Sequence, residues 1–235
     1  MKKLSIVIPC YNEAKNIPLI LNRFSKVIEL DDLQVVLVDN GSFDESQQVL
    51  HDLLPHYPFA KTVRVEKNQG YGFGILMGLR SAKGHYIGWT HADMQTDPYD
   101  VLRALEIIKN KEYSTNIFIK GLRKGRPLFD QFFTVGMSFF EMIFLRTVLW
   151  DINAQPTIFH RSFFDCWQNP PHDFSLDLYA FYMAKKQNLN IVRFNVNFIP
   201  RMHGQSSWNT GLLAKWKFIK RTLMFSAALK KGLKS

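Results

Sequence analysis

The chain has 235 residues, of which 46% are apolar and 21% charged. This length and composition exclude a wholly disordered chain and suit a single large α/β domain with a sizeable core. The net charge of +10 is unevenly placed, because the 58 residues after Asp177 hold 11 Lys/Arg and no acid. The residues up to Asp177 hold 19 Lys/Arg and 20 Asp/Glu, so a near-neutral domain precedes a strongly basic C-terminal quarter.

Short apolar runs rich in β-branched residues predict buried parallel strands in the first half of the chain. These runs are 4–10, 34–38, 62–66, 85–90 and 116–121. Between them, helical spacing predicts a helix from Ile17, a helix over 43–54 with a capping box of Ser42 and Glu45, and a helix over 99–108. Glycines at 70, 72, 74 and 78 predict a loop and a closely packed helix start. The regular alternation predicts a mostly parallel central sheet flanked by helices.

The pattern changes after Arg123. Residues 129–150 are apolar nearly all round and have helical length, which suits a core helix or an interface helix. Residues 175–186 predict another helix, and residues 190–199 alternate like a strand. Residues 211–231 predict a basic amphipathic helix, typical of a membrane interface or of an ordinary surface helix. We expect one domain over 1–208 and a basic appendage over 209–235.

Cysteine content and hydropathy indicate the compartment. Cys10 and Cys166 are too few for a disulfide framework, so a reducing compartment is the simple interpretation. The first apolar stretch is too short for a signal peptide, and no uncharged run reaches the ~18 residues of a spanning helix. We therefore expect a cytoplasmic protein that could still contact a membrane surface.

Polar side chains gather where the predicted strands end. They are Tyr11, Asn12, Glu13, Asp39, Asn68, His91, Asp93, Gln95 and Arg123. Because ligands bind beyond the carboxyl ends of the strands in open parallel sheets, we expect one site at this edge. Carboxylates near a glutamine suit Mg²⁺ or Mn²⁺, and arginines suit phosphate.

Four segments in this order resemble the family 2 glycosyltransferases. They are residues 6–13 (IVIPCYNE), 36–44 (VLVDNGSFD), 68–72 (NQGYG) and 92–95 (ADMQ). The resemblance extends from about residue 4 to about residue 208 and is closest to the branch of dolichol-phosphate mannosyltransferases, which use polyprenyl-phosphate acceptors. It implies a GT-A fold that binds a nucleotide-sugar donor.

The resemblance also implies roles for individual residues. The nucleotide would be contacted by Pro9, Tyr11, Glu13, Asp39, Asn68 and Arg201, the last in a loop over the donor pyrophosphate. The metal, Mg²⁺ or Mn²⁺, would be held by Asp93 and Gln95, with His91 as a further candidate. Arg123 would face the acceptor phosphate.

Three residues depart from the family pattern. His91 stands where the family has an aspartate, Asn40 replaces a second aspartate, and Tyr71 replaces a common lysine. Imidazole can bind Mn²⁺ but supplies no negative charge. The activity could therefore depend less on metal, or His91 could contact the metal ligands and not the metal itself.

The need for a general base depends on the acceptor. A phosphate acceptor is already ionised, whereas a hydroxyl acceptor must lose its proton to a carboxylate. Asp177 matches an acidic position of the family, and Asp151 lies nearby in sequence. A structural role, on the surface of a helix or as a helix cap, explains either acid equally well.

The leading prediction is an inverting glycosyltransferase that moves a sugar to a polyprenyl phosphate, as a peripheral protein on the inner face of the membrane. One alternative is transfer to a saccharide hydroxyl in surface-glycan synthesis. Another, prompted by His91, is a non-catalytic nucleotide-sugar-binding relative. The isoelectric point of about 9.6 suits nucleic acid, but no nucleic-acid motif is present, so we expect an anionic membrane to meet the basic tail. A homodimer is compatible with these features.

Overall fold

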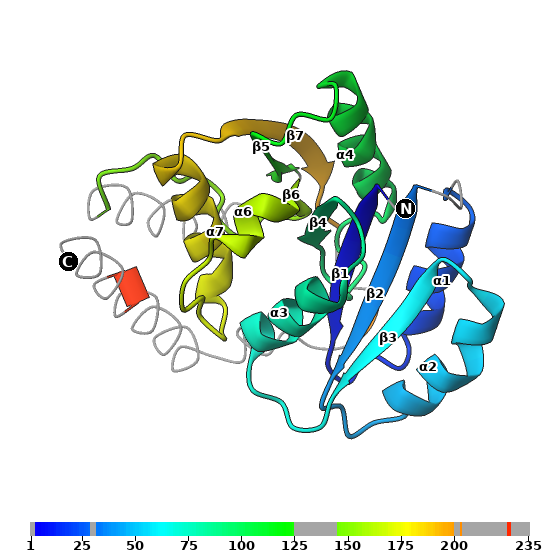
Figure 1. Ribbon diagram of the computed structural model, residues 1–235. Coiled ribbons are helices and arrows are strands. Elements are labelled where there is room, and N and C mark those ends of the chain that lie inside the picture. Colours follow the sequence, from blue (N-terminus) through cyan, green and yellow to red (C-terminus); the bar gives the residue numbers. More distant parts are fainter. Residues whose placement is uncertain (1–2, 29–31, 125–144, 200–202, 204–224, 227–235) are drawn as a thin grey trace.

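The computed structural model describes residues 3–28, 32–124, 145–199, 203 and 225–226 (Figure 1). Within them a seven-stranded sheet has the order β3-β2-β1-β4-β6-β5-β7. The strands are β1 Leu4–Cys10, β2 Leu33–Asn40, β3 Ala60–Val65, β4 Tyr86–Trp89, β5 Ile117–Lys124, β6 Thr157–His160 and β7 Asn190–Asn197. Only β6 is antiparallel to its neighbours, so the sheet is mostly parallel, as the sequence predicts.

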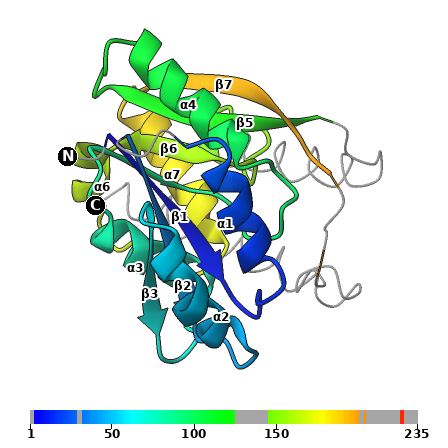
Figure 2. The same cartoon turned by 90° about the vertical axis from the view of Figure 1, so that its right-hand side faces the viewer.

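Helices cover both faces of the sheet (Figures 1 and 2). They are α1 Ile17–Ser25, α2 Ser46–Leu53, α3 Tyr71–Ser81, α4 Tyr99–Asn110, α6 Arg161–Asp165 and α7 Ser175–Lys186, with a 3₁₀ turn η1 Leu54–His56. In one apolar cluster, α1, α2 and α4 pack on one face of the sheet. In a second cluster, α3, α6 and α7 pack on the other face. Strands covered on both sides account for the continuous apolar runs of β1 and β2.

The predicted helices from Ile17, over 99–108 and over 175–186 are confirmed. The helix expected over 43–54 is present, but its capping box is wrong, because α2 begins at Ser46. The hydroxyl of Ser42 instead accepts a hydrogen bond from the backbone N–H of Asn12 at 3.0 Å. A carboxylate oxygen of Asp44 accepts from the N–H of Ser46 at 3.0 Å and so satisfies the start of α2.

The second half departs from the sequence prediction in two places. Strand β6 and the short α6 after it were not expected, and β6 joins β4 to β5. Of the helix expected over 129–150, residues 145–150 are described, and those after Leu145 are not helical. Residues 129–144, Arg201 and most of the helix expected over 211–231 lie outside the described residues, although 225–226 are helical. No helix in the described ranges is long and apolar enough to cross a membrane.

Strand direction places the expected site residues at one edge. Because β6 runs against both β4 and β5, β5 points in the same direction as β4. The carboxyl ends of β1 to β5 therefore lie at a common edge of the sheet. The residues expected to bind a ligand follow these ends.

Candidate functional site

The loops that follow β1 and β2 are joined by hydrogen bonds. The N–H of Asn12 donates to Ser42 Oγ at 3.0 Å, and Asn12 Oδ1 accepts from the N–H of Phe43 at 3.0 Å. The N–H of Glu13 donates to Ser46 Oγ at 2.9 Å. Asn12 has a positive φ of 58°, which its short side chain tolerates in a turn. The two loops thus form one surface at the edge of the sheet.

Two aromatic rings stand exposed on this surface. Tyr11 is 44% exposed and Phe43 is 81% exposed, and their ring centres lie 5.9 Å apart at 82°. Exposed aromatic faces at a ligand site are typical platforms for a nucleobase. The sequence predicts Tyr11 but misses Phe43, whose signal is a large aromatic residue in an otherwise polar turn.

Asp39, near the end of β2, is 1% exposed, and its carboxylate accepts two hydrogen bonds. Its Oδ1 accepts from the N–H of Ser42 at 3.0 Å, and its Oδ2 accepts from Nη1 of Arg64 at 2.7 Å. Arg64 lies opposite Asp39 on β3, and a third of its side chain is exposed. Sequence reasoning missed Arg64, because the register of the two strands is needed to pair them.

The glycine-rich segment packs tightly, as the sequence predicts. Asn68 Oδ1 accepts from the N–H of Gly70 at 2.8 Å, and Gly70 has a φ of 113°, which glycine tolerates. A Cβ atom on Gly72 would lie 2.6 Å from the carbonyl oxygens of Pro171 and Asp173. The start of α3 is therefore in direct backbone contact with the segment before α7.

The loop after β4 carries the expected metal-binding residues. Asp93 is 5% exposed, and its Oδ1 accepts from the N–H of Gln95 at 3.1 Å. The amide Nε2 of Gln95 donates to the carbonyl of Ile199 at 3.2 Å, and the N–H of Ile199 donates to the carbonyl of Gln95 at 3.0 Å. This loop is thus attached to the segment that follows β7. The oxygen Oε1 is the side-chain atom of Gln95 that could bind a cation.

Two of the residues that depart from the family pattern, His91 and Tyr71, lie close together. The ring of His91 lies 6.1 Å from that of Tyr71, and Tyr71 stacks on Phe174 at 4.6 Å and 13°. Burial raises the pKa of the Tyr71 hydroxyl well above its usual value, and the charges of Asp177 and Asp93 add to the rise. The tilted ring of His91 therefore lies beside the stacked rings of Tyr71 and Phe174 at the edge of the site.

The described side chains suit a divalent cation that binds together with the phosphates of a nucleotide. Among them, no three His, Cys, Asp or Glu residues converge as a metal site. Mg²⁺ bound to a nucleotide needs only one or two protein carboxylates, because phosphates and waters supply its other ligands. Asp93, with Oε1 of Gln95, fits such a donor set, and His91 offers a nitrogen in the same loop.

Arg123, near the end of β5, is held by Asp151. Its backbone N–H donates to Oδ2 of Asp151 at 2.9 Å, and its Nε donates to Oδ1 at 2.8 Å. A second contact to Oδ1 comes from Nη2, and the guanidinium lies over the ring of Phe198. The side chains of Arg123 and Asp151 are 9% and 5% exposed, so the ion pair is almost completely buried.

Asp177, considered as a base, lies in a second buried ion pair. Its carboxylate, 2% exposed, accepts from Nε2 of Gln155 at 2.6 Å and from Nε1 of Trp89 at 3.3 Å. The ammonium of Lys120, which is fully buried, lies 3.7 Å away. Lys120 was not singled out from the sequence, although it falls in the run 116–121 that is predicted to be a buried strand.

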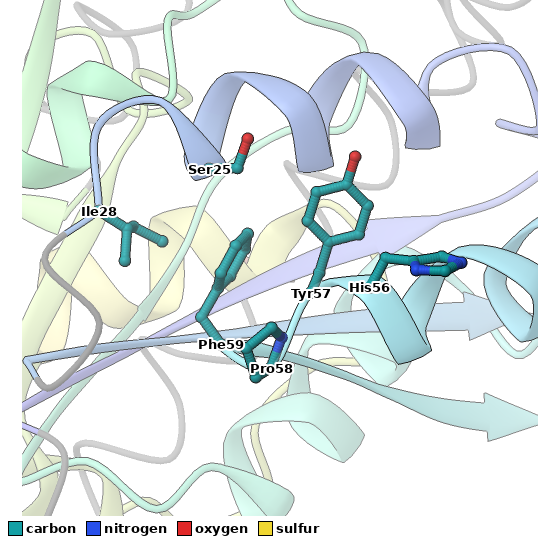
Figure 3. Close-up of a pocket in the computed structure, with 6 residues that line it drawn as sticks. All are labelled: Ser25, Ile28, His56, Tyr57, Pro58 and Phe59. Atoms are coloured by element: carbon teal, nitrogen blue, oxygen red, sulfur yellow. The ribbon is translucent and has the colours of Figure 1, made fainter.

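A separate pocket of about 500 Å³ opens elsewhere (Figure 3). It is lined by Ser25, Ile28, His56, Tyr57, Pro58 and Phe59. The carbonyl of Phe59 accepts from the N–H of Val35 near the start of β2. This pocket therefore lies toward the amino ends of the strands, away from the site residues.

Sequence comparison identifies relatives. A profile described as Glycosyl transferase family 2 matches residues 5–167. The dolichol-phosphate mannosyltransferase of Pyrococcus furiosus is 30% identical over 108 residues, which is 46% of this chain and 30% of that protein. The undecaprenyl-phosphate 4-deoxy-4-formamido-L-arabinose transferase of an Enterobacter species is 36% identical over 105 residues, or 43% of this chain and 32% of that protein. The chain thus spans about a third of the length of these curated relatives.

Structural comparison confirms the predicted GT-A fold. Glucosyl-3-phosphoglycerate synthase from Mycobacterium tuberculosis, solved with Mn²⁺, UDP and glucosyl-3-phosphoglycerate, superposes with a TM-score of 0.71 and 14% identity. The match covers 98% of this chain and 80% of the other. A mannosyltransferase from Pyrobaculum calidifontis, solved with GDP-Man and Mn²⁺, gives a TM-score of 0.68 and 16% identity over 99% of this chain and 64% of the other.

Proposed function

Since the chain belongs to glycosyl transferase family 2, we propose that it transfers a sugar, with inversion, from a nucleotide-sugar to a polyprenyl phosphate. The observation that carries the proposal is the common edge of the sheet, where Asp39, Asp93 and Arg123 lie at or just beyond the carboxyl ends of the parallel strands β2, β4 and β5. The relatives named for dolichol phosphate and undecaprenyl phosphate support the class of acceptor.

The nucleotide binds across the loops after β1, β2 and β3. The base packs against Tyr11 and Phe43, and Asp39 contacts the base or ribose from a fixed direction set by Arg64. Further nucleotide contacts come from Pro9, Glu13, Asn68 and Arg201.

A divalent cation, Mg²⁺ or Mn²⁺, would bind together with the donor diphosphate. Asp93 and Oε1 of Gln95 would hold it, with a ring nitrogen of His91 as a third donor. When bound, such a cation neutralises negative charge on the departing diphosphate. Solved neighbours of this fold contain Mn²⁺ together with UDP or GDP-Man, which supports this assignment.

Arg123 orients the acceptor phosphate. An oxygen of that phosphate attacks the anomeric carbon as the bond from this carbon to the nucleotide diphosphate breaks, which inverts the configuration. The attacking oxygen is already ionised and needs no base. Asp151 and Asp177 are both buried in ion pairs, which favours a phosphate acceptor over a saccharide hydroxyl.

The proposed acceptor and the charge distribution support a reaction at the inner face of a membrane. Val148 and Trp150 are 64% and 47% exposed, and they immediately precede Asp151, the partner of Arg123. Exposed apolar side chains at this point suit a lipid acceptor. The basic residues after Asp177 suit an anionic membrane surface.

A thermal-shift screen of nucleotide-sugars, with and without Mn²⁺, tests the donor half of the proposal. A ligand that binds the folded protein raises its melting temperature. We expect one class of nucleotide-sugar to raise the melting temperature of the wild type in the presence of Mn²⁺, but not that of D93N. The conservative control D97N, in the same loop, should respond like the wild type. No response to any nucleotide-sugar would overturn the proposal.

A further inference from the structure

The register of the sheet aligns four side chains in one row beneath the candidate site. Trp89 of β4 pairs with Thr157 of β6, which pairs with Lys120 of β5, which pairs with Arg193 of β7. Residues paired in this way point to the same face of a sheet. That face is covered by α7, which supplies Asp177 to the middle of the row.

Every described polar contact of the Lys120 ammonium is internal to the protein. Its Nζ donates to the carbonyl of Ala154 at 2.8 Å and to Oγ1 of Thr157 at 2.8 Å, and it lies 3.7 Å from Oδ1 of Asp177. It also lies 5.9 Å from the centre of the Phe181 ring. A lysine with no exposed surface is rare and costly, so a specific partner is expected.

Asp177 connects this lysine to the metal-binding loop. The same oxygen that faces Lys120 accepts the hydrogen bond from Nε1 of Trp89. Trp89 is the last residue of β4, and His91 and Asp93 follow within four residues. The hydrogen bond from Trp89 to Asp177 therefore anchors the last residue of β4, directly before this loop.

We propose that Lys120 and Asp177 form a buried positioning pair that holds Trp89, and through it the loop of residues 91–95, in the geometry for donor binding. The inference rests on the proposed function, because it assigns a purpose to the geometry of that loop. Asp177 acts through Trp89 and does not take a proton from the acceptor. The charge of Lys120 holds Oδ1 of Asp177 in the position where it accepts the hydrogen bond from Trp89.

The pair should respond to pH in a defined direction. Burial lowers the pKa of Lys120 to about 8, and four charged groups surround it: Asp177 of α7, Arg193 of β7, Asp151 and Arg123. The two acids oppose the shift and the two arginines add to it. The ammonium is therefore charged below about pH 8 and neutral above it.

Stability and function should change in opposite directions above that pH. The usual pKa of a lysine is 10.5, so between pH 8 and 10.5 the unfolded chain holds a proton on Lys120 that the folded protein has lost. Through Lys120, the folded state thus gains stability as the pH rises through this window. A fall in sugar transfer between pH 8 and 10.5 therefore cannot come from unfolding caused by the deprotonation of Lys120.

The test follows the indole N–H signal of Trp89 by ¹H–¹⁵N NMR from pH 6.5 to 9.5, assigned with W89F. In the wild type we expect this signal, and the amide signals of Asp93 and Gln95, to move together with a midpoint near pH 8. The movement should vanish in K120R, whose guanidinium stays charged. The control K109M, which breaks a surface pair with Asp32, should behave like the wild type.

Transfer assays over the same pH range complete the test. We expect transfer to fall above about pH 8 in the wild type and K109M but not in K120R, and to be roughly 10- to 100-fold lower in K120M at pH 7. If K120M does not fold, the double variant K120M/D177N, which removes both buried charges, should show no pH-dependent Trp89 signal.

The outcomes separate the two proposals. A Trp89 signal that does not move, or that still moves in K120R or in the double variant, overturns the positioning pair. The same conclusion follows if Trp89 and the loop signals move while transfer does not change. If the wild type transfers no sugar at all, the proposed function fails. The positioning pair is then judged by NMR alone: it stands if the Trp89, Asp93 and Gln95 signals move together near pH 8, and it fails if they do not.

Discussion

Nη1 of Arg64 donates to Oδ2 of Asp39 at 2.7 Å, across the boundary between β3 and β2. Asp39 is buried, whereas a third of the Arg64 side chain is exposed at the edge of the sheet. The ion pair gives the buried carboxylate of Asp39 a basic partner at the edge of the sheet. The contacts with Arg64 and Ser42 thus hold the Asp39 carboxylate in one position, and in the proposed function it meets the nucleotide as a fixed hydrogen-bond acceptor.

Replacing Arg64 should affect both stability and nucleotide binding. R64M leaves Asp39 without its cation, so we expect a loss of about 1–3 kcal/mol in the free energy of unfolding, measured in urea. Weaker nucleotide binding should accompany it. The control R23M breaks an exposed pair with Asp97 and should cost less than about 1 kcal/mol. Equal losses in the two variants would contradict a special role for Arg64.

Phe43 should contribute affinity for the nucleotide without affecting chemistry. Loss of a ring that stacks on a base costs roughly 1–3 kcal/mol, so F43A should raise KM for the donor about 5- to 150-fold. The kcat should stay near that of the wild type, because the ring does not touch the reacting atoms. Y113A removes another exposed ring, at a position outside the proposed site, and is the control. An unchanged KM in F43A would remove Phe43 from the site.

The metal-binding loop predicts an order of effects on Mn²⁺ affinity, measured by calorimetry in the presence of nucleotide. D93N removes the carboxylate and should weaken binding by at least about tenfold, or roughly 1.4 kcal/mol. H91A should weaken it less, because imidazole brings no negative charge. H91D adds a carboxylate and should strengthen it. A greater loss in H91A than in D93N would make His91 the principal ligand.

Gly72 should tolerate no side chain. Its Cβ would lie 2.6 Å from two backbone carbonyl oxygens, and backbone yields less readily than a flexible side chain. We expect G72A to lower the free energy of unfolding by about 1–3 kcal/mol in thermal or urea unfolding. Q69A, at an exposed position in the same segment, should have almost no effect. A fully stable G72A would mean that the segment before α7 can move away.

The sequence predicts the sheet well where strands are long and apolar. Strands β1 and β2 are buried on both faces, so their composition alone identifies them. Strand β6 has only four residues, and its antiparallel place between β4 and β5 depends on contacts far apart in sequence. Periodicity carries no information about such an insertion.

The same limit applies to the site. Tyr11, Asp39 and Asp93 follow strand ends and can be predicted from the chain, but their assigned roles remain proposals. Arg64 and Lys120 become visible only through strand register, which pairs Arg64 with Asp39 and aligns Lys120 with Trp89 through Thr157. The capping box failed because Ser42 is used by the neighbouring loop, a contact between residues 30 positions apart.

The most direct measurement of the central claim is transfer of labelled sugar into lipid. The purified chain is incubated with Mn²⁺, a panel of labelled nucleotide-sugars, and vesicles with or without polyprenyl phosphate, and the label is counted after extraction into organic solvent. The account predicts label in the lipid phase only when polyprenyl phosphate is present, and its loss with D93N. Label that moves only to free saccharides, or that never leaves the nucleotide, would contradict it.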